Sequence, residues 1–206
     1  VPLQMLETTD DLITKCGAYS AFGAIKCLIR AKEWLKPRVA ILGITDVSAE
    51  LYWLLTKKGY DVVTSSFNYK DIARHKIPSD RVIAWGEGGP VNTSTDILLL
   101  CCPSFTEKLT VDIVDTFQCN ALLSLHDCVL PGDSDEKENV LAELDRAGIF
   151  DFCEGLVDLG GMMKAYSMVK ESTPASAYKF ADALNVGMVL MQKMLHLDGI
   201  VKQYDP

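Results

Sequence analysis

The stretch Arg38-Val39-Ala40-Ile41-Leu42-Gly43-Ile44-Thr45-Asp46-Val47-Ser48-Ala49 predicts a strand, a tight turn and a helix. An apolar run leads into Gly43, and a helical pattern then continues to Lys58 before Gly59 ends it. Residues 60–63 are strand-like again. This order is typical of the first βαβ unit of a nucleotide-binding sheet, where a pyrophosphate would lie at the N-terminus of the helix.

The turn itself departs from the usual G-x-G-x-x-G fingerprint. Only Gly43 is retained, while Thr45 stands at the second glycine position and Ser48 at the third. The two hydroxyls offer donors to a phosphate, but their bulk and the charge of Asp46 oppose its close approach. In the alternative interpretation Gly43 only turns the chain, and Thr45 or Ser48 caps the helix. The sequence leaves both interpretations open.

Strands and helices continue to alternate after this unit. The expected strands are residues 61–64, 81–85, 96–102, 121–125 and 149–153, and the expected helices are residues 69–75, 105–117 and 134–147. Asp133 begins the last of these helices as a capping residue, and Gly148 ends it. The pattern predicts an α/β fold with a doubly wound parallel sheet, Rossmann-like, with helical N- and C-terminal flanks.

The flanks define three expected segments. Residues 1–36 read as an N-terminal flank of two helices, the second over residues 19–34, and residues 37–160 form the Rossmann-like domain. Residues 161–206 read as C-terminal helices packed on that domain or on a partner. The helix expected at residues 175–197 is rich in Met and Leu, which suits either ordinary core packing or a homodimer interface.

Composition limits the class of protein. The 206 residues are 49% hydrophobic and 23% charged with a net charge of -8, which argues against non-specific nucleic-acid binding. No apolar run is long enough for a membrane span, and no secretory signal is recognised. The seven cysteines contain no C-x-x-C pair and the three histidines lack metal-ligand spacing, so free thiols, no metal and a cytoplasmic location are expected.

Ligand residues are expected at the carboxyl ends of the strands. Ser65 ends the second strand with Lys70 and Arg74 downstream, where an NAD site would carry an acid, so NADP is favoured over NAD if a dinucleotide binds. In the alternative, Lys70 and Arg74 are solvated helix charges. Cys102 ends the central apolar strand. His126-Asp127-Cys128 is not expected to be catalytic, because adjacent side chains on an extended chain point apart.

Three segments carry a resemblance to a known family. Residues 17–43, residues 130–149 and residues 156–166, with the Gly160-Gly161 turn and the helix expected after it, resemble the cofactor domain of glutamate, leucine and related amino-acid dehydrogenases. The resemblance implies NAD(P) binding, with Asp158 at a position near the nicotinamide that is typically asparagine in that family. The family's catalytic lysine and aspartate belong to a separate substrate domain, so a cofactor domain without its substrate half is expected.

Three functions therefore remain open. The first is a Rossmann-type domain derived from an NAD(P)-dependent dehydrogenase, either binding nucleotide or degenerate and non-catalytic. The second is a protein-interaction or dimerisation module that no longer binds nucleotide. The third, an S-adenosylmethionine-dependent methyltransferase, is disfavoured because residues 38–65 lack both a glycine-rich acidic loop and an acid at the end of the second strand.

Overall fold

The computed structural model describes residues 3–65, 69–83, 85–86, 89–90, 94–101, 109–125 and 130–152. The chain divides into two compact units, one of residues 36–155 and the other of residues 1–35 with residues 156–206. The expected C-terminal helices lie outside the described residues, as do Cys102, residues 126–128 and Asp158. The three expected segments stay a prediction.

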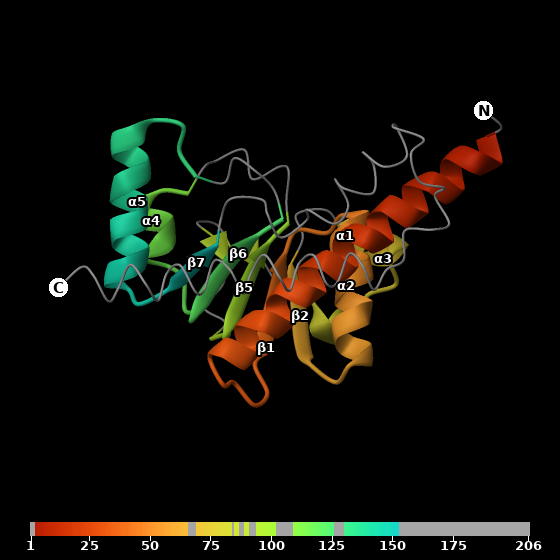
Figure 1. Ribbon diagram of the computed structural model, residues 1–206, viewed down its shortest axis with the longest axis horizontal. Coiled ribbons are helices and arrows are strands. Elements are labelled where there is room, and N and C mark those ends of the chain that lie inside the picture. Colours follow the sequence, from red (N-terminus) through yellow and green to blue (C-terminus); the bar gives the residue numbers. More distant parts are fainter. Residues whose placement is uncertain are drawn as a thin grey trace. The chain divides into compact units, whose positions relative to one another are not determined.

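The unit of residues 36–155 is built on a parallel sheet (Figure 1). Its strands are β1 (Arg38–Leu42), β2 (Asp61–Ser65), β5 (Ile97–Leu100), β6 (Ala121–Ser124) and β7 (Phe150–Phe152). They lie in the order β2-β1-β5-β6-β7, and every pairing between neighbours is parallel. The expected Rossmann-like α/β fold with a parallel sheet is confirmed, and Gly43 directly follows β1.

Helices cover this sheet. Helices α4 (Val111–Val114) and α5 (Ser134–Arg146) contribute Val114, Val140 and Leu144 to a buried cluster on one face of the strands. The strand members of that cluster are Ala40, Leu42, Val63, Leu98, Leu100 and Leu122. Helix α2 (Asp46–Lys57) contributes no described residue to it, and its right-handed crossover from β1 to β2 directs it to the opposite face.

Local capping explains where α5 begins and ends. The Asp133 side chain accepts hydrogen bonds from the backbone N–H groups of Asp135 and Glu136, which lack partners within the helix. Gly148 follows the last turn with a φ of 70°, a conformation that favours glycine. Both roles were predicted from the sequence, and both are confirmed.

At the amino end of the sheet, polar groups join three strands. The Asp96 carboxylate accepts from the Arg38 backbone N–H at 2.8 Å and from the Asn120 side-chain amide at 3.0 Å. The Thr95 hydroxyl donates to the Arg38 carbonyl at 2.8 Å. These contacts position the start of β1, β5 and β6 relative to one another.

Two sequence-based expectations are wrong. Residues 3–31 form one continuous helix, α1 (Leu3–Ala31), where two helices were expected. Arg81 belongs to a 3-10 turn (η1, Ser79–Arg81), and Val82 makes only one bridge to Thr64. The expected strand at residues 81–85 is therefore reduced to that bridge, and β3 (Trp85–Gly86) pairs with β4 (Gly89–Pro90) in a separate antiparallel hairpin.

Two further properties concern the described part of the chain. Cys16, Cys27, Cys101 and Cys119 are free thiols. Among the described helices, none has the length and apolar character needed to cross a bilayer.

Candidate functional site

The candidate site lies at the carboxyl ends of β1 and β5, two neighbouring strands of the sheet. From β1 the chain continues to β2 on one side, whereas β5 pairs with β1 on the other side. Ligands of open α/β sheets bind beyond the carboxyl ends of the strands at such a switch point. Gly43 donates its N–H to the Ser65 carbonyl at 2.7 Å, and Cys101 donates its N–H to the Leu42 carbonyl at 2.8 Å. These bonds hold the ends of β1, β2 and β5 together.

The turn from β1 into α2 is held by its own hydroxyl groups. Gly43 has a φ of 94°, which a side chain at this position would strain. Thr45 is the N-cap: its hydroxyl accepts from the Ser48 backbone N–H at 3.2 Å, and the Ser48 hydroxyl accepts from the Thr45 N–H at 2.8 Å. The buried Ser48 hydroxyl also contacts the Gly43 carbonyl at 3.1 Å. Thr45 and Ser48 thus cap the helix, as the second interpretation of the sequence expected.

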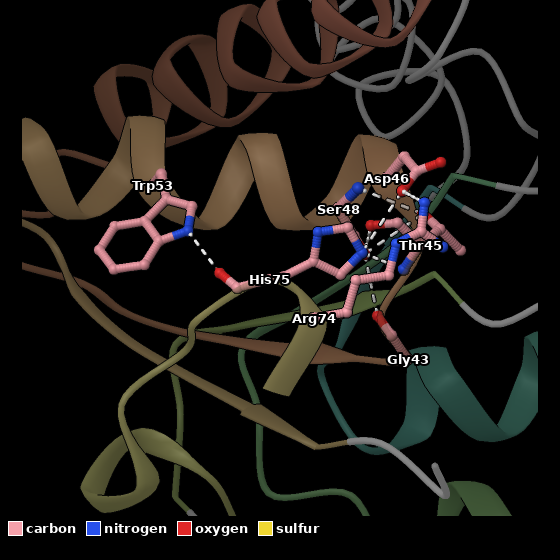
Figure 2. A network of polar contacts seen from close by, with 7 residues as sticks. All are labelled: Gly43, Thr45, Asp46, Ser48, Trp53, Arg74 and His75. Atoms are coloured by element: carbon pink, nitrogen blue, oxygen red, sulfur yellow. Dashed lines mark hydrogen bonds and ion pairs between the residues drawn. The ribbon is translucent and has the colours of Figure 1, made fainter. Parts of the chain in front are cut away.

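A charged cluster stands beside this cap (Figure 2). The Asp46 carboxylate oxygen Oδ1 lies 3.3 Å from the Arg74 guanidinium and 3.4 Å from His75 Nε2. Both partners come from the end of α3 (Tyr69–Arg74) and its following turn. The Trp53 indole N–H donates to the His75 carbonyl at 3.2 Å, which joins the same turn to the middle of α2.

Some of the other expected site residues lie near this turn, and others lie outside the described residues. Ser65 is 1% exposed, and its hydroxyl has no hydrogen-bond partner among the described residues. Lys70 lies exposed in the first turn of α3. The structure therefore brings together Gly43, Thr45, Ser48, Ser65 and Arg74, whereas Cys102 and Asp158 lie outside the described residues.

Sequence reasoning missed the partners of Asp46. It treated this acid only as an obstacle to phosphate and gave no role to His75. The available signal was an acid at the first helical position followed by an adjacent arginine and histidine at the end of the next helix in the chain. An acid is stabilised at a helix N-terminus, and it attracts such side chains when the fold brings them near.

The N–H groups and the charge of this turn bear on whether a phosphate could bind there. The N-terminal N–H groups of Asp46 and Val47 lack partners within the helix, as phosphate binding requires. The neighbouring N–H groups of Thr45 and Ser48 are already bonded to hydroxyls. The Asp46 charge would repel a phosphate by about 1–4 kcal/mol at 4 Å, from bulk water to a surface dielectric. Because the Asp46 side chain is 58% exposed, the lower end of that range applies.

The described chemistry at this site is polar, and its groups bond mainly to one another. Among the described residues no cluster of three or more His, Cys, Asp or Glu side chains could hold a metal ion. The hydroxyls of Thr45 and Ser48 are bonded within the cap, and Arg74 and His75 both contact Asp46. This arrangement stabilises the turn and joins α3 to α2.

Comparison with known proteins identifies the fold. An L-tryptophan dehydrogenase from Nostoc punctiforme matches with a TM-score of 0.67 at 14% identity, covering 87% of this chain and 53% of that one. Plasmodium falciparum glutamate dehydrogenase 2 matches with a TM-score of 0.65 at 14% identity, covering 88% and 45%. A hetero-hexameric glutamate dehydrogenase from Thermus thermophilus, in a Leu-bound form, matches with a TM-score of 0.59 at 13% identity, covering 87% and 46%.

These matches confirm, at the level of the fold, the resemblance to amino-acid dehydrogenases that the sequence indicated. The chain has the Rossmann-type α/β fold that these dehydrogenases contain. It spans about half the length of the solved structures it matches. No family model and no curated protein sequence matches it.

Proposed function

We propose that this chain is a degenerate dehydrogenase-type domain that does not hold a dinucleotide tightly at its β1–α2 turn and does not catalyse hydride transfer by itself. The observation that carries the proposal is the Asp46 carboxylate, paired with Arg74 and His75 where a pyrophosphate would meet the helix N-terminus. The capping box of Thr45 and Ser48 supports it, because their hydroxyls use N–H groups of the same turn.

The fold supports a dehydrogenase ancestry rather than a methyltransferase. The fold matches that of an amino-acid dehydrogenase over most of the chain, and β2 ends in a serine in place of an acid. In the glutamate and leucine dehydrogenases that the sequence resembles, the catalytic lysine and aspartate belong to a substrate domain. We propose that residues 1–206 by themselves therefore do not turn over an amino acid.

Residual cofactor preference follows from the end of β2. If a dinucleotide binds weakly, we propose NADP over NAD, because Ser65 and Lys70 replace the acid that would hold a ribose. Arg74 contributes less than the sequence suggests, since its guanidinium is 3.3 Å from Asp46. Lys70→Ala with Arg74→Ala should then weaken NADP selectively, and an equal loss for both nucleotides would contradict this preference.

We also propose a cytoplasmic location for the protein. For residues 161–206 we propose a role in self-association. The Met- and Leu-rich stretch at residues 175–197 supports a homodimer or protein-partner interface. Met188→Asp should give folded monomers by sedimentation if this stretch is an interface. Unfolding by circular dichroism would instead assign it to a packed core.

Calorimetric titration of the purified chain with NADP, NAD and S-adenosylmethionine tests the proposal. We expect no saturation below the millimolar range for any of them, and no amino-acid-dependent reduction of nicotinamide. A matched variant, Thr45→Gly with Asp46→Asn and Ser48→Gly, restores the fingerprint and removes the acid, so it should gain dinucleotide affinity if it remains folded. Tight binding of either dinucleotide by the natural chain would overturn the proposal.

A further inference from the structure

The cluster at the start of α2 has the charges of a phosphate site and contains its own anion. Asp46 is the first residue of a twelve-residue helix, where the helix dipole favours negative charge. The Arg74 guanidinium and the His75 imidazole both contact the same Asp46 oxygen, Oδ1 (Figure 2). The Arg74 guanidinium and the His75 imidazole thus meet at one carboxylate oxygen, on the first residue of the helix.

A second observation comes from the neighbouring strand. Ser65 is bonded to Gly43 through its backbone, so its side chain is attached to the same edge of the sheet. Its hydroxyl is buried and makes no hydrogen bond to any described residue. A buried hydroxyl usually has a hydrogen-bond partner, so one without a partner needs a physical explanation. A phosphate that reached the ends of β1 and β2 would give this hydroxyl a partner.

We infer that Asp46 acts as an internal substitute for phosphate: an autoinhibitory contact that engages Arg74 and His75 and excludes a phosphate-bearing ligand from the turn. The inference rests on the proposed function and assigns the weak dinucleotide binding to one residue, Asp46. Asp46 carries the charge that a phosphate would bring, and the chain supplies it at an effective concentration that a free anion does not match.

The contact also fixes the position of α3. Asp46 pairs with the end of α3 at one point, and the Trp53 indole bonds to the His75 carbonyl at another. A phosphate would have to displace the carboxylate from Arg74 and His75 before using them. Neutralising Asp46 removes both the competitor and the repulsion, while the Trp53 contact still holds the turn in place.

The test compares two variants that each remove one carboxylate from α2. Asp46→Asn removes the charge at the cluster, and Glu50→Gln removes one a single turn further along the same helix. Inorganic pyrophosphate is titrated into each folded protein by calorimetry at low salt. We expect Asp46→Asn to bind it at least tenfold more tightly than the natural chain, and Glu50→Gln to bind it within twofold of the natural chain.

Adding Arg74→Gln to Asp46→Asn should abolish most of the gain, because the guanidinium would be the main new contact. If Asp46→Asn does not fold, Asp46→Ser provides the same neutralisation with a smaller side chain. An absent gain, an equal gain in Glu50→Gln, or a gain that survives Arg74→Gln would each overturn the inference. Tight dinucleotide binding by the natural chain would instead overturn the proposed function, so the two failures are distinguishable.

Discussion

Ser48→Ala tests whether the β1–α2 turn is a structural cap. The Ser48 side chain is fully buried, and its hydroxyl accepts from the Thr45 N–H at 2.8 Å and contacts the Gly43 carbonyl at 3.1 Å. Alanine removes both bonds, so the Thr45 N–H and the Gly43 carbonyl each lose their contact with this hydroxyl. Each such loss costs about 1–3 kcal/mol when buried, and the turn is only half-buried at Thr45. We expect a total loss of about 2 kcal/mol.

Ser48→Gly sharpens this prediction because it restores the glycine of the dinucleotide fingerprint. It loses the same hydrogen bonds, and glycine inside a helix costs about 1 kcal/mol more than alanine. The expected order of stability is therefore Ser48, then alanine, then glycine, with glycine about 3 kcal/mol below the natural residue. A turn built for close backbone approach to a phosphate would favour glycine over alanine instead.

Urea unfolding followed by circular dichroism measures these differences. With a slope of about 2 kcal/mol per molar urea, Ser48→Ala should lower the midpoint by about 1 M without changing the slope. Ser134→Ala is the matched control, because Ser134 is an exposed serine in the first turn of α5, and it should change stability by less than about 0.5 kcal/mol. An unchanged midpoint for Ser48→Ala, or a glycine variant more stable than the alanine variant, would refute the reasoning.

Three further predictions concern the rest of the unit. Leu99→Ala should lower the free energy of unfolding in urea by about 2–5 kcal/mol, because Leu99 is fully buried in β5. Leu35 is 97% exposed, so Leu35→Ala should leave stability nearly unchanged. Equal losses in the two variants would contradict the burial of Leu99. Asp133→Ala should cost about 1 kcal/mol through loss of the α5 cap, and retention of full stability would show that another group replaces it. Burial raises the pKa of the Cys119 thiol to about 12, so alkylation mapped by mass spectrometry should be slow at pH 8 in the folded protein and fast in urea. Because the folded state holds this proton more tightly, the thiol's contribution to stability should decline as pH rises from about 9 toward 12, and rapid labelling of the native protein would contradict this environment.

Much of the fold could be predicted because short-range signals agree with the long-range packing. The apolar run before Gly43 and the run at residues 97–100 are both buried strands, and Asp133 caps the helix that follows it. Burial on both faces selects such apolar runs in a parallel sheet. The dehydrogenase-like fold could be read from their order.

The wrong expectations have local causes. Glycine costs only about 1 kcal/mol inside a helix, so Gly17 does not break α1, although the sequence suggested two helices there. The run from Val82 onward has strand-like composition, but only the Thr64–Val82 bridge and the bond from the Ile83 N–H to the Thr64 carbonyl form. The composition of a segment sets its propensity to form a strand. It does not set how many backbone hydrogen bonds a neighbouring strand can offer.

The candidate site was predicted less completely than the fold. Spacing correctly placed Gly43, Thr45 and Ser48 at the turn, because they are close in sequence. The pairing of Asp46 with Arg74 could not be read in the same way, since it depends on how α3 returns toward α2. Contacts between elements depend on the three-dimensional path of the chain, which the spacing of residues in the sequence does not give.

The insertion of β5 beside β1 has a consequence for synthesis on the ribosome. Arg38, at the start of β1, and Asp96, just before β5, are 58 residues apart, and they bond to each other only when both have emerged. At about 5–20 residues per second, translation of that interval takes about 3–12 seconds. During this time one side of the apolar strand β1 has no neighbour, and unpaired strand edges of this kind promote aggregation. The nascent chain should therefore bind chaperones most strongly between the emergence of β1 and that of β5.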